Sequence, residues 1–405
     1  MIYVALTDDW ELRGNGSGDV KTLQIRPMQE LVSIFNRYGV RASFYAEIMQ
    51  QVTFRRWQSR YPELKALADE WDAAVLDTYR QGHDIQLHLH PQWKDATYEA
   101  KRWRLPAPWS LCDHNAADVK LMIAQGKAYL ENLLRSVDPN YRCVAFRAGS
   151  WAIAPSPFAM HTLAQLGVVM DTSIVGGLRY TTRNLEVDYR NVEERIWPYY
   201  PRMEDARQVS THPEPIVCLP THTHKGARSQ YLRRDIKLHW QRFTSKNKST
   251  SSGDWTDTSV PSWFLPLKKV VCIVFCRYLW GETSISDLSC LDYGLLSHII
   301  KKVRRQAHKL NGRDVPVVLT CHSKDVRNFD YIDRFIHDLS RANDVRCLTL
   351  TELAQKLSDG TFPVRYKTER SPEGKTRAVV EEYVRESHQV DEGGRPKAPV
   401  TIRQG

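Results

Sequence analysis

Several features that would place a protein in a special class are missing from this sequence. None of its 8 cysteines belongs to a CxxC pair, which argues against a zinc ribbon or a dense disulfide framework. Most of them lie in apolar runs, so we expect them to be reduced and structural, as in a cytoplasmic protein. The first residues, Met-Ile-Tyr-Val-Ala-Leu-Thr-Asp-Asp, also lack the basic segment and long apolar stretch of a secretory signal. We therefore expect a cytoplasmic location.

Long hydrophobic runs and internal repeats are missing too. The strongest apolar run, Val270 to Cys276, is far shorter than the roughly 20 residues that a membrane-spanning helix requires. We interpret it as a buried strand and predict no transmembrane segment, although peripheral contact with a membrane remains open. Without a repeated unit, a solenoid or a propeller is not expected.

The composition is that of an ordinary globular protein, with 405 residues, 42% of them hydrophobic and 26% charged. The net charge of +10 is concentrated between Lys225 and Thr250, where eight basic residues minus one acidic residue give +7. We interpret this stretch as a basic insertion that could attract a phosphate-linked sugar carrier or a membrane surface. A nucleic-acid partner is not expected, because no reader motif accompanies the charge. Salt-dependent binding to nucleic acid would reverse that interpretation.

Strand-like runs alternate with amphipathic helical stretches as far as about Leu357, a pattern typical of a mostly parallel sheet or barrel. The expected strands are Ile2 to Leu6, Arg41 to Tyr45, Asp84 to His90, Cys143 to Phe146, Ile216 to Leu219, Val315 to Cys321 and Arg346 to Leu348. The expected helices are Pro27 to Arg37, Leu64 to Tyr79, Ala116 to Leu134, Pro157 to Leu166, Tyr331 to Leu339 and Leu350 to Leu357.

Two pairs of polar residues coincide with the ends of these expected strands. Asp8 and Asp9 directly follow the first strand, where functional groups of parallel sheets gather. His88 and His90 alternate along another strand, so both can approach one divalent ion from the same face. A solvated Asp-Asp turn and a merely polar His-x-His are the competing interpretations, and the combination of the two pairs favours a site.

Three further polar residues stand at strand ends. Arg147 opens the run Arg-Ala-Gly-Ser-Trp, Asp171 follows an apolar run, and His322 comes just after the most apolar strand. Taken separately, Arg147 could be a surface ion-pair partner and His322 an ordinary loop histidine.

In this order along the chain, the five features resemble those of the polysaccharide deacetylases, carbohydrate esterase family 4, whose catalytic unit is the NodB homology domain. The resemblance runs from Met1 to about Leu357. It implies an α/β fold, a distorted (β/α) barrel of the polysaccharide deacetylase type, over residues 1–357. The basic insertion at about 225–250 and a polar, poorly structured tail at 358–405 would be additions to it.

The resemblance also implies catalytic roles. Asp8 matches the catalytic base, and Arg147 matches the arginine that orients it. His322 matches the general acid, and Asp171 matches the acid that tunes this histidine.

For the metal, the resemblance implies Asp9 and His88 as ligands of a divalent ion, most simply Zn²⁺. The family usually spaces its metal histidines as HxxxH, but Gln92 stands four residues after His88. His90 is therefore expected to serve as the third ligand, unless that ligand lies elsewhere in the chain.

Further residues are expected at the substrate. The third motif departs from the family's Arg-x-Pro-aromatic pattern, so the oxyanion would be held by the backbone N–H of Ser150 or Trp151. Trp93 could stack on a sugar ring or simply pack in the core. His222 and His224 form a second His-x-His pair, for which substrate contact and an ordinary polar loop are both open.

The implied activity is metal-dependent hydrolysis of an N-acetyl or O-acetyl group on a sugar. Without a signal for export, the chain more closely resembles the members encoded with surface polysaccharide biosynthesis, such as that of lipopolysaccharide and O-antigen. Its partner would then be an acetylated sugar or glycan intermediate. Two alternatives stay open: a non-catalytic carbohydrate-binding protein with a degenerate domain, and an amidohydrolase of a formamide or a cyclic amide.

Overall fold

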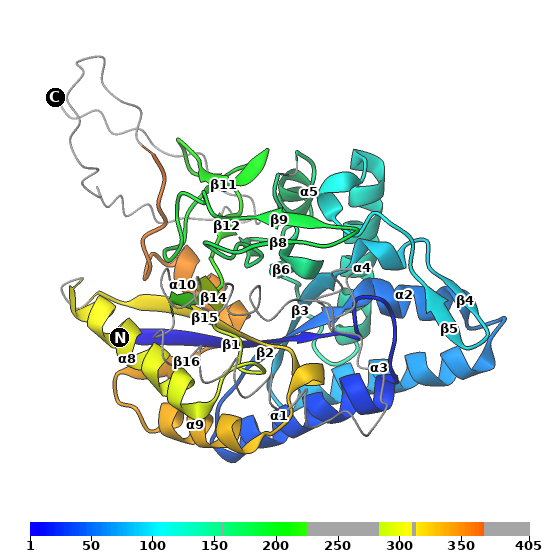
Figure 1. Cartoon of the computed structure of the whole chain (residues 1–405), viewed down its shortest axis with the longest axis horizontal. Helices are drawn as coiled ribbons and strands as arrows, with labels where there is room; N and C mark the ends of the chain where they lie inside the picture. Colours follow the sequence, from blue (N-terminus) through cyan, green and yellow to red (C-terminus); the bar gives the residue numbers. More distant parts are fainter. Residues whose placement is uncertain (156, 226–282, 310–312, 368–405) are drawn as a thin grey trace, which may run out of the picture.

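A parallel β-sheet with helices packed against it forms the centre of the molecule (Figure 1). The structure is a computed structural model, and it describes residues 1–155, 157–225, 283–309 and 313–367. The strands of the sheet follow the order β12-β7-β6-β3-β2-β1-β15, and β16 also pairs with β1. Every pairing in this sheet is parallel. The carboxyl ends of the strands therefore meet at one edge.

The strands of the sheet are β1 (Ile2–Trp10), β2 (Ser43–Glu47), β3 (Asp84–Leu89), β6 (Ala145–Ala148), β7 (Met170–Asp171), β12 (Val217–Cys218), β15 (Val315–Cys321) and β16 (Val345–Cys347). The helices are α1 (Arg26–Arg37), α2 (Ile48–Trp57), α3 (Pro62–Arg80), α4 (Ala116–Leu134), α5 (Ala159–Gln165), α8 (Tyr293–Lys309), α9 (Asp330–Ser340) and α10 (Leu350–Ser358). Small two-stranded antiparallel sheets are formed by β4 (Thr97–Glu99) with β5 (Arg102–Arg104), β8 (Arg179–Thr181) with β9 (Glu186–Asp188), β10 (Pro201–Arg202) with β11 (Asp205–Val209), and β13 (Thr223–Lys225) with β14 (Thr283–Ile285).

The sheet curls into a half-barrel, and two isolated bridges span the gap between its edge strands. Thr221, just beyond β12, bridges to Val318 of β15, and Asp287, just beyond β14, bridges to Thr320 of β15. The predicted α/β barrel-type fold is confirmed. The bridges bring the segments after β12 and β14 to the same rim as the end of β1.

Two hydrophobic cores lie on the two faces of this curved sheet. The larger core joins the outer face to the surrounding helices. The smaller one fills the inside, where Tyr3 and Ala5 of β1 meet residues from other strands, and Leu353 of α10 and Phe362 close it. Since both faces are covered, the strands are almost wholly apolar until they approach the rim.

Most of the expected elements are present, and α4 and β15 have the predicted bounds. Asn115 is the N-cap of α4, accepting a hydrogen bond from the N–H of Asp118. Helices α2 and α8 were not predicted, although the apolar residues of α8 recur at helical spacing. Residues 359–367 continue the packed chain beyond the boundary expected at Leu357. Val270 to Cys276 and nearly all of the basic stretch lie outside the described residues.

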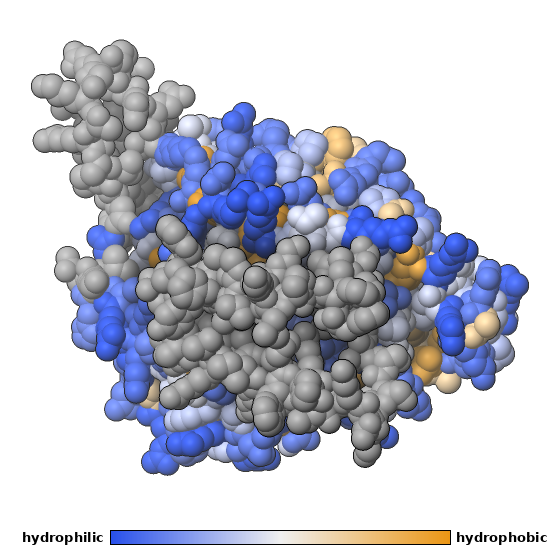
Figure 2. Space-filling model, in the orientation of Figure 1, coloured by the Kyte–Doolittle hydropathy of each residue, from blue (hydrophilic) through white to orange (hydrophobic). Residues whose placement is uncertain are grey.

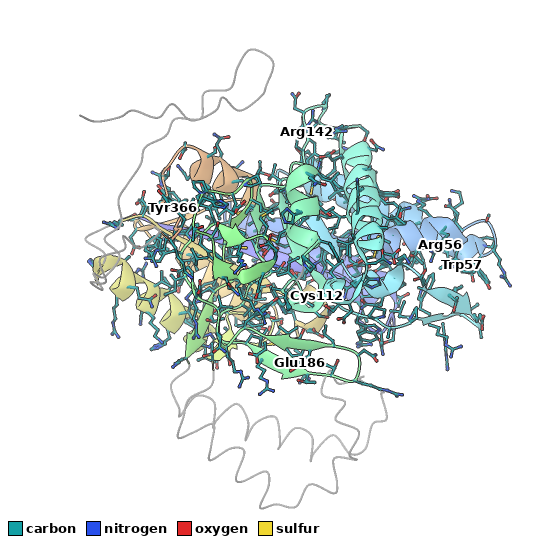
Figure 3. The ribbon with its side chains drawn as sticks, turned by 90° about the horizontal axis from the view of Figure 1, so that it is seen from above. Arg56, Trp57, Cys112, Arg142, Glu186 and Tyr366 are labelled. Carbon is teal, nitrogen blue, oxygen red and sulfur yellow. The ribbon has the colours of Figure 1, made fainter. Side chains whose placement is uncertain are left out.

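The surface in the view of Figure 2 is mainly hydrophilic where the chain is described, with isolated hydrophobic side chains. Seen from above, the end of α2 with Arg56 and Trp57 lies at the opposite end of the molecule from Tyr366 (Figure 3). Within the described ranges, none of the six cysteines forms a disulfide, and no helix combines the length and apolarity needed to cross a membrane.

Candidate active site

Strand β1 sends carboxylates to both of its faces as it reaches the rim. Tyr3 and Ala5 point into the barrel, so the alternation of a strand places Asp9 and Glu11 on the same inner side. Asp8 has the opposite parity and faces the helix-covered side. The two adjacent aspartates therefore serve different environments, although both are buried.

The inner side of the rim carries a cluster that could hold a metal ion. It consists of Glu11, Glu47, His88 and His90, all buried, whose ligand atoms lie within 4.8 Å of one another. Glu47 ends β2 directly opposite His88 of β3 in the strand register. The other two follow β1 and β3, so three neighbouring strand ends supply the four side chains.

The hydrogen bonds of this cluster fit a metal site. Nδ1 of His88 lies 2.8 Å from the backbone oxygen of Arg147, which places its proton there and leaves Nε2 as a ligand atom. One oxygen of Glu47 caps α2 by accepting two backbone N–H groups at 3.0 and 3.2 Å. Its other oxygen, Oε2, is buried without a hydrogen-bond partner among the described residues. Two imidazoles and two carboxylates are also a donor set that suits zinc.

The pKa values of the two glutamates in the cluster are strongly shifted. Burial raises the pKa of Glu47 to about 8. Burial also raises the pKa of Glu11, but Lys324 and His90 outweigh it and hold that pKa well below its usual range. The ammonium of Lys324 forms an ion pair with Glu11, and Nε2 of His90 contacts the same carboxylate.

Arg147 lies at the centre of the barrel, fully buried, and its side chain binds Asp9. Its Nη1 donates to Oδ1 of Asp9 at 2.5 Å. Its guanidinium also lies 4.3 Å from the ring centroid of Tyr45 and 4.8 Å from that of Trp151. Four hydroxyl groups complete the surroundings of the guanidinium: Thr7, Thr172, Thr221 and Thr320. Seven surrounding groups thus fix the position of Arg147, and through it that of Asp9.

A histidine–aspartate pair faces Asp9 across the barrel mouth, the open end at the carboxyl ends of the strands where Asp9, Trp151 and His322 meet. Nδ1 of His322 lies 2.7 Å from Oδ2 of Asp287, and Nε2 lies 3.5 Å from Oδ2 of Asp9. Burial lowers the pKa of His322, but the two carboxylates outweigh it and raise that pKa to about 9. The imidazole is therefore charged at neutral pH, with its Nε2 proton directed into the mouth.

Two expected catalytic residues have other neighbours. Asp8 accepts hydrogen bonds from the backbone N–H and the hydroxyl of Ser323 at 2.7 and 2.8 Å, and burial raises its pKa to about 7. Asp171 accepts from Ser173, and burial raises its pKa to about 6. Arg147 therefore binds Asp9 rather than Asp8, and the carboxylate beside His322 is Asp287 rather than Asp171.

The turn after β6 is strained where the sequence predicts an oxyanion site. Ser150 and Trp151 adopt left-handed backbone angles, with φ of 53° and 60°, which are uncommon for residues other than glycine. The ring of Trp151 lies 6.3 Å from that of His322. Gly149 packs so closely on His90 that a Cβ would come within 2.5 Å of its ring. The turn thus packs against His90, one candidate ligand, and places Trp151 at the mouth.

The remaining substrate candidates lie away from this mouth. Trp93 is buried in an aromatic cluster with Phe54 and Trp103, at centroid distances of 6.0 and 5.1 Å. Nδ1 of His222 and Nδ1 of His224 both lie within 3.1 Å of the hydroxyl of Ser286, on the side opposite to Thr221. The structure therefore brings together Asp9, His88, His90, Arg147, Trp151 and His322, but not Trp93, His222 or His224.

Sequence reasoning missed four polar residues of the site. Glu11 stands in the Thr-Asp-Asp-Trp-Glu run, and its parity with Asp9 was a usable signal. Glu47 stands two residues after the expected strand Arg41 to Tyr45 and precedes a helix that was not predicted. Lys324 stands two residues after His322, while Asp287 is far from any motif and carried no local signal.

No protein-family model matches the sequence, and no curated protein matches it. Solved structures resemble the fold at low identity. A protein named as a polysaccharide deacetylase from Mycobacterium smegmatis is 14% identical, with a TM-score of 0.48 over 92% of this chain and 94% of that one. Another so named from Pseudomonas aeruginosa PAO1 is 11% identical, with a TM-score of 0.45 over 89% and 93%. A GH57-type branching enzyme from Pyrococcus horikoshii is 10% identical, with a TM-score of 0.46 over 91% and 72%. These similarities concern the fold and assign no activity to this chain.

Proposed function

We propose that this chain is a metal-dependent hydrolase that removes an acetyl group from the nitrogen or oxygen of a sugar. The observation that carries the proposal is that two groups of polar residues lie together at one barrel mouth. A buried cluster of two glutamates and two histidines lies beside a charged histidine–aspartate pair. Strand β1 joins them, because Asp9 faces His322 and Glu11 belongs to the cluster.

Glu11, Glu47, His88 and His90 would hold the ion, which we propose to be Zn²⁺. When bound, such an ion polarises an acyl oxygen and makes a water more acidic. The unpartnered oxygen of Glu47 is suited to face it, and so is Nε2 of His88, which lies 3.1 Å from Oε2 of Glu11 in the same cluster.

Asp9 is the carboxylate best placed to take a proton from the attacking water. It lies on the inner side of β1, and Arg147 fixes one of its oxygens while the other faces the mouth. Asp8, the base that the family resemblance implies, is bound to Ser323 on the opposite side of the strand. Its pKa near 7 would suit a base, so both residues belong in the test.

His322 is the group suited to protonate the leaving atom. Asp287 binds its Nδ1 and keeps the ring charged, so the Nε2 proton is available at the mouth. Water adds to the acyl carbon and loses a proton to Asp9; the carbon–nitrogen or carbon–oxygen bond then breaks, and His322 protonates the departing atom. The backbone N–H of Ser150 or Trp151 would stabilise the intermediate oxyanion.

The test combines metal quantification of the purified full chain with acetate-release assays. N-acetylated and O-acetylated sugars would be offered free, nucleotide-linked and as finished polymer, with a formamide and a cyclic amide as further substrates. We expect about one metal ion per chain and acetate release that a chelator abolishes. His88→Gln should lose both properties, whereas His83→Gln, a buried histidine outside the cluster, should retain both.

Asparagine variants separate the two possible bases. Asp9→Asn should retain the metal and lose turnover, while Asp8→Asn should retain both. If Asp9→Asn instead lost the metal, Asp9 would be a ligand, as the family resemblance implies. A turnover loss confined to Asp8→Asn would transfer the role of base to that residue.

A second candidate is a carbohydrate-binding protein without catalysis, and Lys324 is the observation in its favour. The buried ammonium already neutralises Glu11, which a domain that had lost its metal would require. A chain purified without metal that binds acetylated sugar and releases no acetate would establish this candidate.

For the substrate, we propose an intermediate of surface polysaccharide synthesis, such as that of lipopolysaccharide or O-antigen, handled in the cytoplasm. The six described cysteines form no disulfide, which supports a reducing location. Activity on exported polymer alone would contradict this part of the proposal.

A further inference from the structure

A cavity lies on the outer side of the barrel, between the β13–β14 strand pair and α8. It has a volume of about 180 Å³. Its lining includes Arg195, Lys225 and Lys302, the two imidazoles of His222 and His224, and the hydroxyl-bearing Thr223. Lys302 of α8 donates to the backbone oxygen of Lys225 at 3.2 Å, which ties the helix to β13 across the cavity.

The charge lining this cavity is of one sign. None of the described residues that line it is acidic. Arg195, Lys225 and Lys302 form no ion pair with any carboxylate in the described parts of the chain. Nearby on the same helix, by contrast, Arg304 is paired with Asp344. Three unpaired cations around one small cavity produce a positive potential that an anion would relieve.

Hydrogen bonds and close packing hold the side chains that line the cavity in place. The hydroxyl of buried Ser286 lies 2.7 Å from Nδ1 of His222 and 3.1 Å from Nδ1 of His224, which fixes both rings. Arg195 lies across Gly176, where a Cβ would come within 2.6 Å of its side chain. Burial lowers the pKa of His222 to about 3, and His224 and Lys302 add to this lowering.

We propose that this cavity binds a phosphoryl group carried by a small ligand. A doubly charged tetrahedral oxyanion matches three converging cations better than a singly charged carboxylate does, and the arginine fork suits its oxygens. The cavity is distinct from the barrel mouth. Thr221 and Asp287 face inward to Arg147 and His322. Their neighbours His222 and Ser286 contact each other outside the mouth, and His222 lines the cavity. Binding there does not depend on the proposed hydrolase activity.

Calorimetric titration of the full chain tests this proposal, with inorganic phosphate, a hexose 1-phosphate and acetate as separate ligands. We expect saturable binding of at least one phosphate ligand, about tenfold or more tighter than that of acetate. Tighter binding of the hexose phosphate would identify a sugar carrier as the source, and tighter binding of inorganic phosphate the free ion. Saturable binding of neither phosphate ligand would overturn the proposal.

Variants locate the binding. Lys302→Gln should weaken phosphate binding about tenfold, and adding Arg195→Gln should weaken it further. Lys301→Gln removes the same charge from the neighbouring, exposed position of α8 outside the cavity, and it should leave binding unchanged. Equal weakening by Lys301→Gln would show a general charge effect and refute the site. All of these side chains are at least partly exposed, so the variants should fold, which circular dichroism would verify.

Discussion

Glu47 has two separable tasks, and two substitutions distinguish them. Its Oε1 caps helix α2, while its Oε2 has no partner in the described chain and belongs to the candidate metal cluster. Glu47→Gln retains an oxygen for the cap and removes the anionic ligand. Glu47→Ala removes both.

The expected magnitudes follow from the two tasks. Loss of a ligand should weaken metal binding at least as much as loss of a supporting residue does, that is by about a hundredfold. With free metal at about 100 times the parent Kd, bound metal stabilises the fold by about 2.7 kcal/mol, and a hundredfold weaker Kd leaves about 0.4 kcal/mol. The Glu47→Gln variant should therefore lose about 2.3 kcal/mol of metal-dependent stability.

Without metal, the free energy of unfolding of the two variants should depend mainly on the helix cap. Glu47→Gln should lie within about 1 kcal/mol of the parent, because the cap persists and the buried acid, with its pKa near 8, is largely neutral at pH 7. Glu47→Ala should be less stable than Glu47→Gln by about 1 kcal/mol for the cap, and more where a cavity remains.

Urea unfolding with a chelator and with added zinc, together with metal quantification, measures both quantities. Glu352→Gln, at the N-terminal capping box of α10 and outside the cluster, is the matched control and should leave the metal content unchanged. A Glu47→Gln variant that binds metal as tightly as the parent would refute the ligand assignment. Equal metal-free stability of the two Glu47 variants would refute the cap.

Three other predictions concern residues around and outside the cluster. Asp287→Asn should leave metal content unchanged and lower kcat by about a hundredfold or more, because His322 loses the carboxylate that holds it charged; an unchanged kcat would exclude the pair from catalysis. Gly149→Ala should displace His90 and weaken metal binding in a titration, since the added Cβ overlaps the ring, and parent-like affinity would contradict that packing. Burial lowers the pKa of His83 to about 4, below the unfolded value near 6.5, so the unfolded state binds more protons between these values and stability falls as pH falls through that window. At pH 5 this costs about 2 kcal/mol relative to pH 7, and His83→Gln should lose that share of the pH dependence in urea unfolding; identical pH profiles would disprove the assignment.

Much of the architecture could be predicted because it depends on local pattern. Apolar strand-length runs between amphipathic segments specify a parallel sheet covered by helices, and β15 and α4 were located by this pattern alone. Polar residues at strand ends indicated the rim, since in a parallel sheet all carboxyl ends meet there. Helix α2 escaped prediction because its polar Gln50 and Gln51 are buried against the core, which weakens the amphipathic signal.

The sequence by itself determined the fold class, the rim and the strands that reach it. Only the tertiary structure decided which side chains meet, and the physical reasons are parity and closure. Adjacent residues of β1 face opposite sides, so Arg147 binds Asp9, while Asp8 binds Ser323. Asp287, by contrast, reaches His322 because the segment after β14 bridges to β15 where the half-barrel closes, a contact that no local sequence pattern encodes.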